Sequence, residues 1–414
     1  MSSSVPSQET TTQASPPTTP SLVEIGVVIA GTLDSVDSLA TKQAMELLRS
    51  FMALHFPDFK FRIARVRRPE LSSEGRVQPS VLLLQAVEDR DASHWDFVFV
   101  VTAAELAGHY SPFCFAALSR PLDAGVFSLS LIDPIVAGVE MEDEQRVELI
   151  AKRLSRLMLH ALGHLAGLPA SQRRDELLFH PAHAGDLDKM RSLDEESVET
   201  QRMAFAEVAD QRLEEYTRRP TNRWMFSLRA AWINRREILQ AIRGARPWQF
   251  PHRLSRLTIA SVSTVAILLM TAEAWDLGLS QDGLHLALLV LAALWVTTVY
   301  VIIRQQLLMR RSRRITEQSV VTAVSALGIV LVGMAVTWTA LFGLGSVVSW
   351  LLFEPELIVA WAGASELNAS RVGWATVFRM NLFTASIGLL IGALGASFES
   401  QHYFRHIIFV DEEI

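Results

Sequence analysis

The sequence has a single cysteine, Cys114, which excludes an intramolecular disulfide and any zinc site built from several cysteines. This scarcity favours a reducing compartment. Residues 1–20 also lack the basic segment and the apolar segment that make a signal peptide. They are rich in Ser, Thr, Pro and Gln, so we expect a disordered tail.

Charge is missing from long stretches of the second half of the chain. The mean hydropathy of +0.24 reflects these stretches, and residues 320–353 contain no charged side chain. We expect four transmembrane helices, each long enough to cross a hydrocarbon core of about 30 Å, at 257–275, 284–303, 318–342 and 380–398. Gly343 and Gly345 offer a break, so 343–366 is left open as a re-entrant segment, an interfacial segment or an extra span.

Arginine is concentrated on one side of the apolar runs, and the opposite loops hold only Arg371 and Arg379. The basic residues are Arg243, Arg246, Arg253 and Arg256 before the first expected span, and Arg304, Arg310, Arg311, Arg313 and Arg314 between the second and third. The opposite loops are acidic. The positive-inside rule then predicts a multi-pass protein of the inner cell membrane with both termini in the cytoplasm and the lipid bilayer as its partner. A channel or transporter subunit, motivated by 320–353, is a third hypothesis, although no span carries a charge near its middle.

Residues 221–256 connect the two halves and mix aromatic side chains with arginines. Trp224, Phe226 and Trp232 lie among six arginines between positions 223 and 246. This composition is typical of a helix lying on an anionic membrane surface. The alternative is an ordinary connecting helix packed on the soluble domain. Nucleic-acid binding is not expected, because the basic charge lies next to the membrane rather than in a separate patch.

Residues 21–220 alternate between β-rich runs and helical patterns. The expected strands are 23–30, 59–66, 95–102 and 126–132, and the expected helices are 37–56, 77–87 and a long one over 142–168. This order predicts an α/β or α+β layered domain of one soluble unit. The fold class of the whole chain is therefore a layered soluble domain followed by an all-α transmembrane domain over 257–414.

The long helix carries the one chemically specific motif. His160 and His164 are spaced at i and i+4, so both imidazoles project from the same helix face and can reach one metal ion. Gly167 permits a tight turn beyond them. In zinc peptidases a glutamate after the first histidine takes a proton from the metal-bound water, but Ala161 stands here. Alanine accepts no proton, so the usual hydrolytic route lacks its base.

This arrangement resembles the metzincin motif H-E-x-x-H-x-x-G-x-x-H, and more narrowly the archaemetzincin-like zinc metallopeptidases, over residues 23–195. The order of strands and helices, and the segment 177–179 in the place of the methionine turn, are similar. The resemblance implies a metzincin-like fold. It also marks departures: Ala161 for the catalytic glutamate, Ala170 for the third histidine and Leu178 for the methionine.

Three interpretations of the histidines remain open. They are core residues of a domain that lost its metal, or zinc ligands completed by His180 or His183, or part of an active peptidase with Asp175, Glu176 or Asp186 as a substitute base. The leading hypothesis is a pseudo-metallopeptidase without catalytic residues that binds a protein or peptide ligand, or regulates, at the cytoplasmic face. The alternative is a membrane-bound zinc peptidase with a non-standard third ligand and base. Cys114 lies in an apolar segment and is expected to be buried rather than a ligand.

Overall fold

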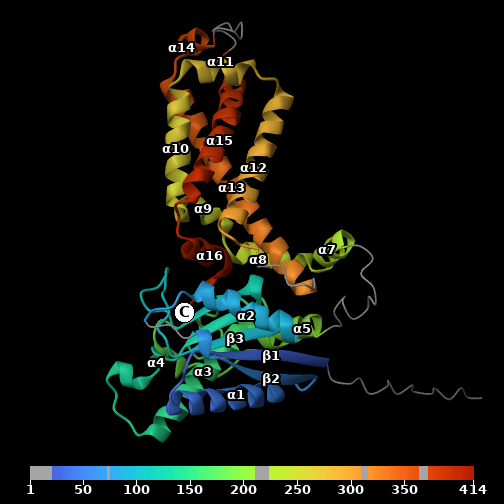
Figure 1. The fold of residues 1–414 in the computed structure, drawn as a ribbon, viewed down its shortest axis with the longest axis vertical. Helices are drawn as coiled ribbons and strands as arrows, with labels where there is room; N and C mark the ends of the chain where they lie inside the picture. Colours follow the sequence, from blue (N-terminus) through green and yellow to red (C-terminus); the bar gives the residue numbers. More distant parts are fainter. Residues whose placement is uncertain (1–20, 72–74, 210–222, 309–315, 363–371) are drawn as a thin grey trace, which may run out of the picture.

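The computed structural model describes residues 21–71, 75–209, 223–308, 316–362 and 372–414. The expected tail 1–20 and the arginines between 310 and 314 lie outside the described residues. A layered sheet domain carries a long helical bundle, and short helices join the two parts (Figure 1).

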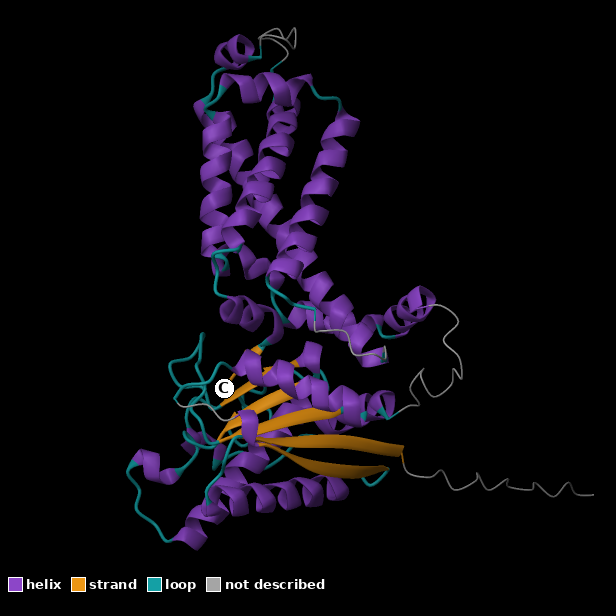
Figure 2. Cartoon of the chain, in the orientation of Figure 1, coloured by secondary structure: helices purple, strands orange, loops and turns teal. Residues whose placement is uncertain are grey.

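A six-stranded mixed sheet forms the centre of the first part (Figure 2). Its strands, in spatial order, are β2 (Phe59–Arg68), β1 (Ser21–Ala30), β3 (Phe97–Thr102), β5 (Ala124–Ser128), β4 (Ala116–Ser119) and β6 (Glu412–Glu413). The first four run parallel, whereas β4 is antiparallel to β5 and β6 is antiparallel to β4. Because β6 comes from the far end of the chain, the range 21–220 does not contain the whole sheet.

Helices cover both faces of the sheet, as alternation along β1 requires. Val27 points into a core shared with α1 (Ser35–His55), α3 (Asp143–Leu165) and α5 (Glu195–Val208). Val28 points into the core of the opposite face, where α2 (Pro79–Ser93) lies. The shorter elements of this part are η1 (Pro69–Leu71), η2 (Arg120–Leu122), η3 (Pro134–Ala137) and α4 (Ala184–Leu187). The layered architecture expected from the sequence is present.

The second part is a bundle of apolar helices. By length and composition, three helices could each cross a membrane: α12 (Gly283–Arg304), α13 (Glu317–Leu352) and α15 (Trp374–Ala396). A fourth crossing would come from α10 (Ser255–Leu269) and α11 (Ala272–Ser280) if this pair, bent by 90°, counts as one span. The short helix α14 (Pro355–Trp361) lies with α11 at the end away from the sheet (Figure 1).

The bundle differs from the expected spans at two places. The apolar run 257–275 does not form a single helix, because the chain turns at Met270 and Thr271. Residues 318–342 do form a helix, but α13 continues to Leu352 without a break at Gly343 or Gly345. A glycine inside a run of apolar helix formers lowers helix propensity only modestly, so it does not have to end the helix. The segment after α13 holds α14, and 363–366 lies outside the described residues.

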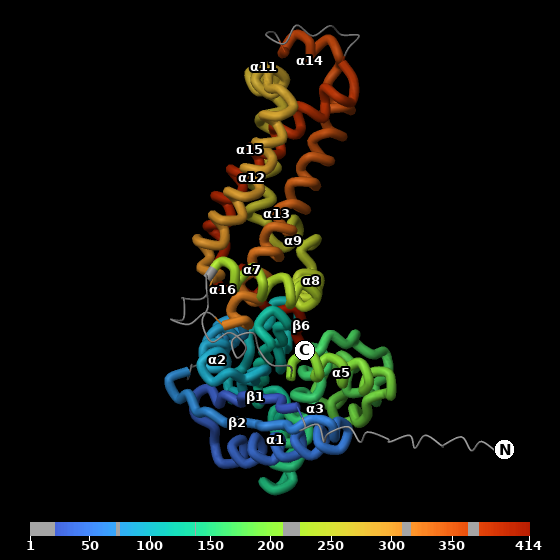
Figure 3. The backbone as a smooth tube through the Cα atoms, turned by 90° about the vertical axis from the view of Figure 1, so that its right-hand side faces the viewer, coloured from blue at the N-terminus to red at the C-terminus, as the bar shows by residue number. Residues whose placement is uncertain are grey.

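Short helices form the junction between the two parts (Figure 3). Residues 221–256 make not one helix but α7 (Arg223–Ile233), α8 (Arg235–Gly244), η4 (Pro247–Gln249) and α9 (Phe250–Arg253). Beyond the last bundle helix, α16 (Gln401–Phe409) leads back to β6. One apolar core runs from the α2 face of the sheet through Phe250 and Phe404 into the bundle, so the junction is itself packed and buried.

Candidate functional site

The long helix α3 positions the histidine pair. Its first turn carries Asp143 and Glu144, which suit the positive end of the helix dipole. Ile150, Leu154 and Leu157 then recur at three and four residues and are buried against the sheet. This phase turns His160 inward, so that it is only 1% exposed, and leaves His164 in the last turn.

The helix α3 ends in the tight turn at Gly167 that the sequence predicted. Gly167 has a φ of 90°, a conformation that favours glycine, and the Leu168 amide donates to the Gly163 carbonyl at 3.1 Å. Below the helix, Leu178 is buried, and a side chain at position 163 would overlap it. The segment 177–179 therefore packs directly against the histidine helix.

The two ring nitrogens of His160 have different surroundings. Its Nδ1 donates to the Leu177 carbonyl at 2.8 Å, because a carbonyl can only accept. Its Nε2 is buried without a hydrogen bond and lies 3.5 Å from an oxygen of Glu412. The ring is thus oriented as in metal sites, with a backbone acceptor on the far nitrogen, but it faces a carboxylate.

His164 faces carboxylates with both nitrogens. Nε2 donates to Asp411 at 2.8 Å, and Nδ1 lies 2.6 Å from Glu412. Burial opposes the charged ring, but the two carboxylates outweigh it and raise the pKa of His164 to about 9. The ring is therefore a cation at neutral pH, paired with two anions.

The two histidines considered as a third zinc ligand, His180 and His183, lie in different places. His180 joins the pair, since its Nδ1 forms a 3.0 Å hydrogen bond with the Glu412 carboxylate, although its side chain is half exposed. His183 is 68% exposed and turns to its own helix start, where its Nδ1 accepts the Asp186 amide at 3.2 Å. We call His160, His164 and His180 with Asp411 and Glu412 the histidine site.

The three acids considered as substitute bases make contacts elsewhere. Asp175 and Glu176 pair with Arg173 at 2.8 and 3.1 Å, and Asp175 is well exposed. The Asp175 pKa is lowered by its hydrogen bond from Arg173. Asp186 is buried and accepts the Ala182 amide at 3.3 Å. These contacts assign the acids to local turns rather than to the histidine site.

The residues that complete the histidine site were not predicted from the sequence. Asp411 and Glu412 follow α16 and reach the site through the β4–β6 pairing, more than 200 positions beyond the histidines. Burial alone would raise the Glu412 pKa, but the imidazoles of His160, His164 and His180 around the carboxylate hold it well below its usual range. No local motif marks these acids; charge complementarity with the histidines was the only available signal.

Zinc does not fit this donor set. A zinc-bound histidine is neutral and offers a lone pair to the ion. In His164 both nitrogens face carboxylates, and Ala170 supplies no ligand. Among the described residues, no group of three or more His, Cys, Asp and Glu side chains is arranged to hold a metal ion.

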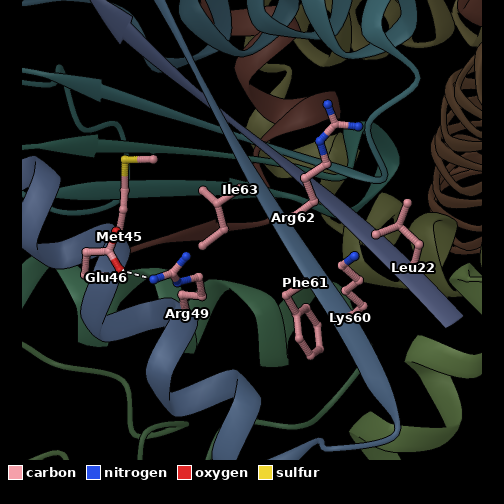
Figure 4. Close-up of a pocket in the computed structure, with 8 residues that line it drawn as sticks. All are labelled: Leu22, Met45, Glu46, Arg49, Lys60, Phe61, Arg62 and Ile63. Carbon is pink, nitrogen blue, oxygen red and sulfur yellow. Dashed lines mark ion pairs between the residues drawn. The ribbon is translucent and has the colours of Figure 1, made fainter. Parts of the chain in front are cut away.

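Two further features lie outside the histidine site. Cys114 is fully buried, and its thiol donates to the Ala116 carbonyl at 3.3 Å; burial raises the pKa of that thiol. A groove of about 460 Å³ lies between α1 and β2 and contains the Arg49–Glu46 ion pair (Figure 4). Since β2 and β6 are opposite edges of the sheet, this groove is remote from the histidines.

No protein-family model matches the chain, and no curated protein matches its sequence. Several solved structures are similar, and three of them are compared with this chain. An archaemetzincin from Methanopyrus kandleri is 17% identical, with 45% of this chain and 97% of that chain covered and a TM-score of 0.34. A zinc-dependent peptidase from Methanocorpusculum labreanum and an archaemetzincin from Archaeoglobus fulgidus, the latter complexed with malonate, are each 14% identical. Each covers 43% of this chain and 99% of its own, with TM-scores of 0.34 and 0.31. At this similarity, the chemistry of this chain has to be argued from its own residues.

Proposed function

We propose that this chain is an integral membrane protein whose cytoplasmic, archaemetzincin-like domain lacks peptidase activity and serves as a binding or regulatory module. The observation that carries the proposal is the histidine site itself. Its two helix histidines contact buried carboxylates from the same chain, and the residue between them that would act as base is Ala161.

The missing base removes the proton-transfer step of metal-assisted hydrolysis. A general base must lie within hydrogen-bond reach of the attacking water and accept its proton. Glu412 is the carboxylate in contact with all three histidines, and the imidazoles around it hold its pKa low. A carboxylate stabilised in this way is a weak base, so it is a poor substitute for the missing glutamate.

The distribution of charge supports the membrane orientation. The helix α9, the start of α10 and the end of α12 lie at the bundle end near the sheet domain and carry Arg253, Arg256 and Arg304 (Figure 1). The helices α11 and α14 lie at the far end and carry Glu273 and Glu356, with Arg379 as the basic residue that contacts α11 there. The positive-inside rule then assigns the sheet domain to the cytoplasm. The uncharged stretch that motivated a channel or transporter subunit forms one continuous helix, α13, so nothing in its shape favours a pore.

A membrane-bound zinc peptidase is the alternative, and one observation favours it. The Nε2 of His160 is buried and has no hydrogen bond, and His180 reaches the same carboxylate as the helix pair. If Glu412 moved away, three imidazoles would face the space that it leaves.

A hydrolysis assay tests the proposal. The full-length protein, purified in detergent and supplied with zinc, would be incubated with casein and with a fluorogenic peptide library, and compared with His160→Ala. We expect no hydrolysis above the level of the variant. Zinc-dependent cleavage by the native chain that disappears in His160→Ala would show that the domain is an enzyme.

A further inference from the structure

The segment Val410–Ile414 connects the bundle side of the molecule to the histidine site. It follows α16 and runs antiparallel to β4, with Glu413 opposite Ala117 and Glu412 opposite Leu118. The Asp411 and Ile414 amides donate to the Leu118 and Ala116 carbonyls at 3.1 and 2.8 Å. An extended segment added to a sheet edge gains affinity from its backbone and specificity from its side chains.

Each of the three acidic side chains in this segment meets its own set of donors. Asp411 accepts from His164 and from the Arg120 amide at 2.8 and 3.1 Å. Glu412 contacts the three histidines at 2.6 to 3.5 Å.

Glu413 accepts from the amides of His109, Tyr110 and Ser111 at 2.7 to 3.1 Å, and it pairs with His406 at 2.6 Å. Charge-assisted hydrogen bonds of this kind are selective for carboxylates. The three donor sets therefore recognise an Asp-Glu-Glu triplet.

An aliphatic side chain follows the triplet and fills an apolar position. Ile414 is 2% exposed and joins the sheet core beside Phe115 and Leu118. Its carbonyl accepts the Phe115 and Ala116 amides at 2.7 and 3.0 Å. The edge of β4 and the histidine site together thus bind an extended strand with three carboxylates and then an aliphatic residue.

Two observations indicate that the segment Asp411–Ile414 occupies a ligand-binding site and is not only the strand that completes the sheet. The strand pairing itself is short, with two residues of β6 in register with β4, while most polar contacts are made by the side chains. The Nε2 of His160 is also left buried and without a hydrogen bond, aimed at Glu412 from 3.5 Å. Burial of carboxylates costs free energy unless each is paired, so a strand needed only for the sheet would be built more simply from apolar residues.

We propose that the β4 edge and the histidine site form a receptor for an extended acidic peptide, and that Asp411–Ile414 is its tethered resident ligand. A separate segment of the same chemistry, Asp-Glu-Glu followed by an aliphatic residue, competes with it. The inference rests on the proposed function, because the site is taken to bind and not to cleave. A short tether gives the resident segment a millimolar effective concentration, so an external peptide binds the native chain weakly.

The test uses the full chain in lipid nanodiscs and a fluorescein-labelled, amidated peptide with the sequence of residues 408–414. Glu412→Gln weakens the tethered ligand, and Glu196→Gln, exposed on α5, is the matched control. We expect Glu412→Gln to bind the peptide about tenfold more tightly than the native chain and the control. A peptide with Gln at its middle Glu should bind about tenfold more weakly than the parent peptide.

Equal or absent binding by the native chain and Glu412→Gln would overturn the proposal and leave β6 as a purely structural strand. If Glu412→Gln does not fold, Ile414→Ala weakens the tether without touching a carboxylate, and the same tighter binding is expected. Mass spectrometry of the peptide separates the two claims. Cleaved peptide would contradict the non-enzymatic function while recognition stands, whereas no binding and no cleavage would contradict the receptor alone.

Discussion

The contact between His164 and Asp411 joins a cation and an anion that are both mostly buried, with side chains 14% and 2% exposed. Removing His164 takes the closest charge partner from Asp411 and leaves it the Arg120 guanidinium at 3.7 Å and the Arg120 amide at 3.1 Å. The cost therefore stays at the lower end of that for breaking a buried pair. We expect His164→Ala to lower the free energy of unfolding by about 3 kcal/mol, measured by denaturant or thermal unfolding of the full chain in detergent.

The sequence supplies a matched control for this substitution. His183 was, like His180, a candidate for the third ligand, but its side chain is 68% exposed. His183→Ala should cost no more than about 1 kcal/mol, the usual cost of losing a helix N-cap, because His183 caps the short helix α4. Equal losses in the two variants would mean that the pairing of His164 with Asp411 contributes nothing specific.

Asp37, in the first turn of α1, gives the sheet domain a pH dependence. Burial, together with Asp34 and Asp133, raises its pKa to about 6 against the opposing effect of Arg146. The folded state therefore holds the proton more tightly than the unfolded state, and stability falls as pH rises from about 4 through 6. Asp37→Asn should be more stable than the native chain at pH 7, by on the order of 1 kcal/mol, and equal to it at pH 4.

Unfolding curves at several pH values check this prediction, with Asp58→Asn as the control because the Asp58 side chain is 64% exposed. The control should track the native chain at every pH. A difference for Asp37→Asn that does not change between pH 4 and 7 would contradict the assigned cause.

At the scale of elements, α7 presents two unlike faces. Ala230 and Phe226 pack on Val320 and Val324 of α13. Trp224, Leu228 and Trp232, four residues apart, are 71–80% exposed on the outer side. An apolar stripe next to arginines and beside the bundle that we propose to span the membrane suits the lipid surface.

A spin label at Leu228→Cys tests where this stripe lies. In nanodiscs containing phosphatidylglycerol, the label should be more accessible to oxygen, which dissolves in lipid, than to a water-soluble nickel chelate. A label at Met203→Cys, 60% exposed on α5, should show the reverse. If both labels behave alike, α7 is an ordinary connecting helix.

Element by element, periodicity predicted what depends on local sequence. The strands β1, β2 and β3 and the helices α1 and α3 lie close to their expected ranges, because apolar spacing decides which faces are buried. The strand β5 was expected at 126–132, but it spans Ala124–Ser128. The break between α10 and α11 was missed, since both sides of it are apolar. The continuity of α13 was missed because glycines were given too much weight as breakers.

At the scale of the whole molecule, the sequence predicted the two helix histidines of the candidate site but not the carboxylates that contact them. The spacing of His160 and His164 indicated a shared face, and the structure places both at one site. What occupies that site depends on the return of the chain through α16, a contact across more than 200 residues that no local pattern encodes. His180 and His183 could not be separated for the same reason.

The orientation of the whole chain has its own test. Because Cys114 is buried, a thiol reagent should react only with a single cysteine introduced at an exposed position. We expect a membrane-impermeant maleimide to label Glu356→Cys, on α14, in intact cells. Glu196→Cys, on α5, should react only after the membrane is opened. The opposite pattern would place the sheet domain outside the cytoplasm.

The central claim is that carboxylates of the same chain, and not a zinc ion, pair with the histidines of α3. The most direct measurement is the metal content of the full-length protein, purified without chelators and analysed by mass spectrometry of the elements. We predict far less than one zinc per chain, and the same value for His160→Ala. One zinc per native chain, lost in His160→Ala, would contradict the account.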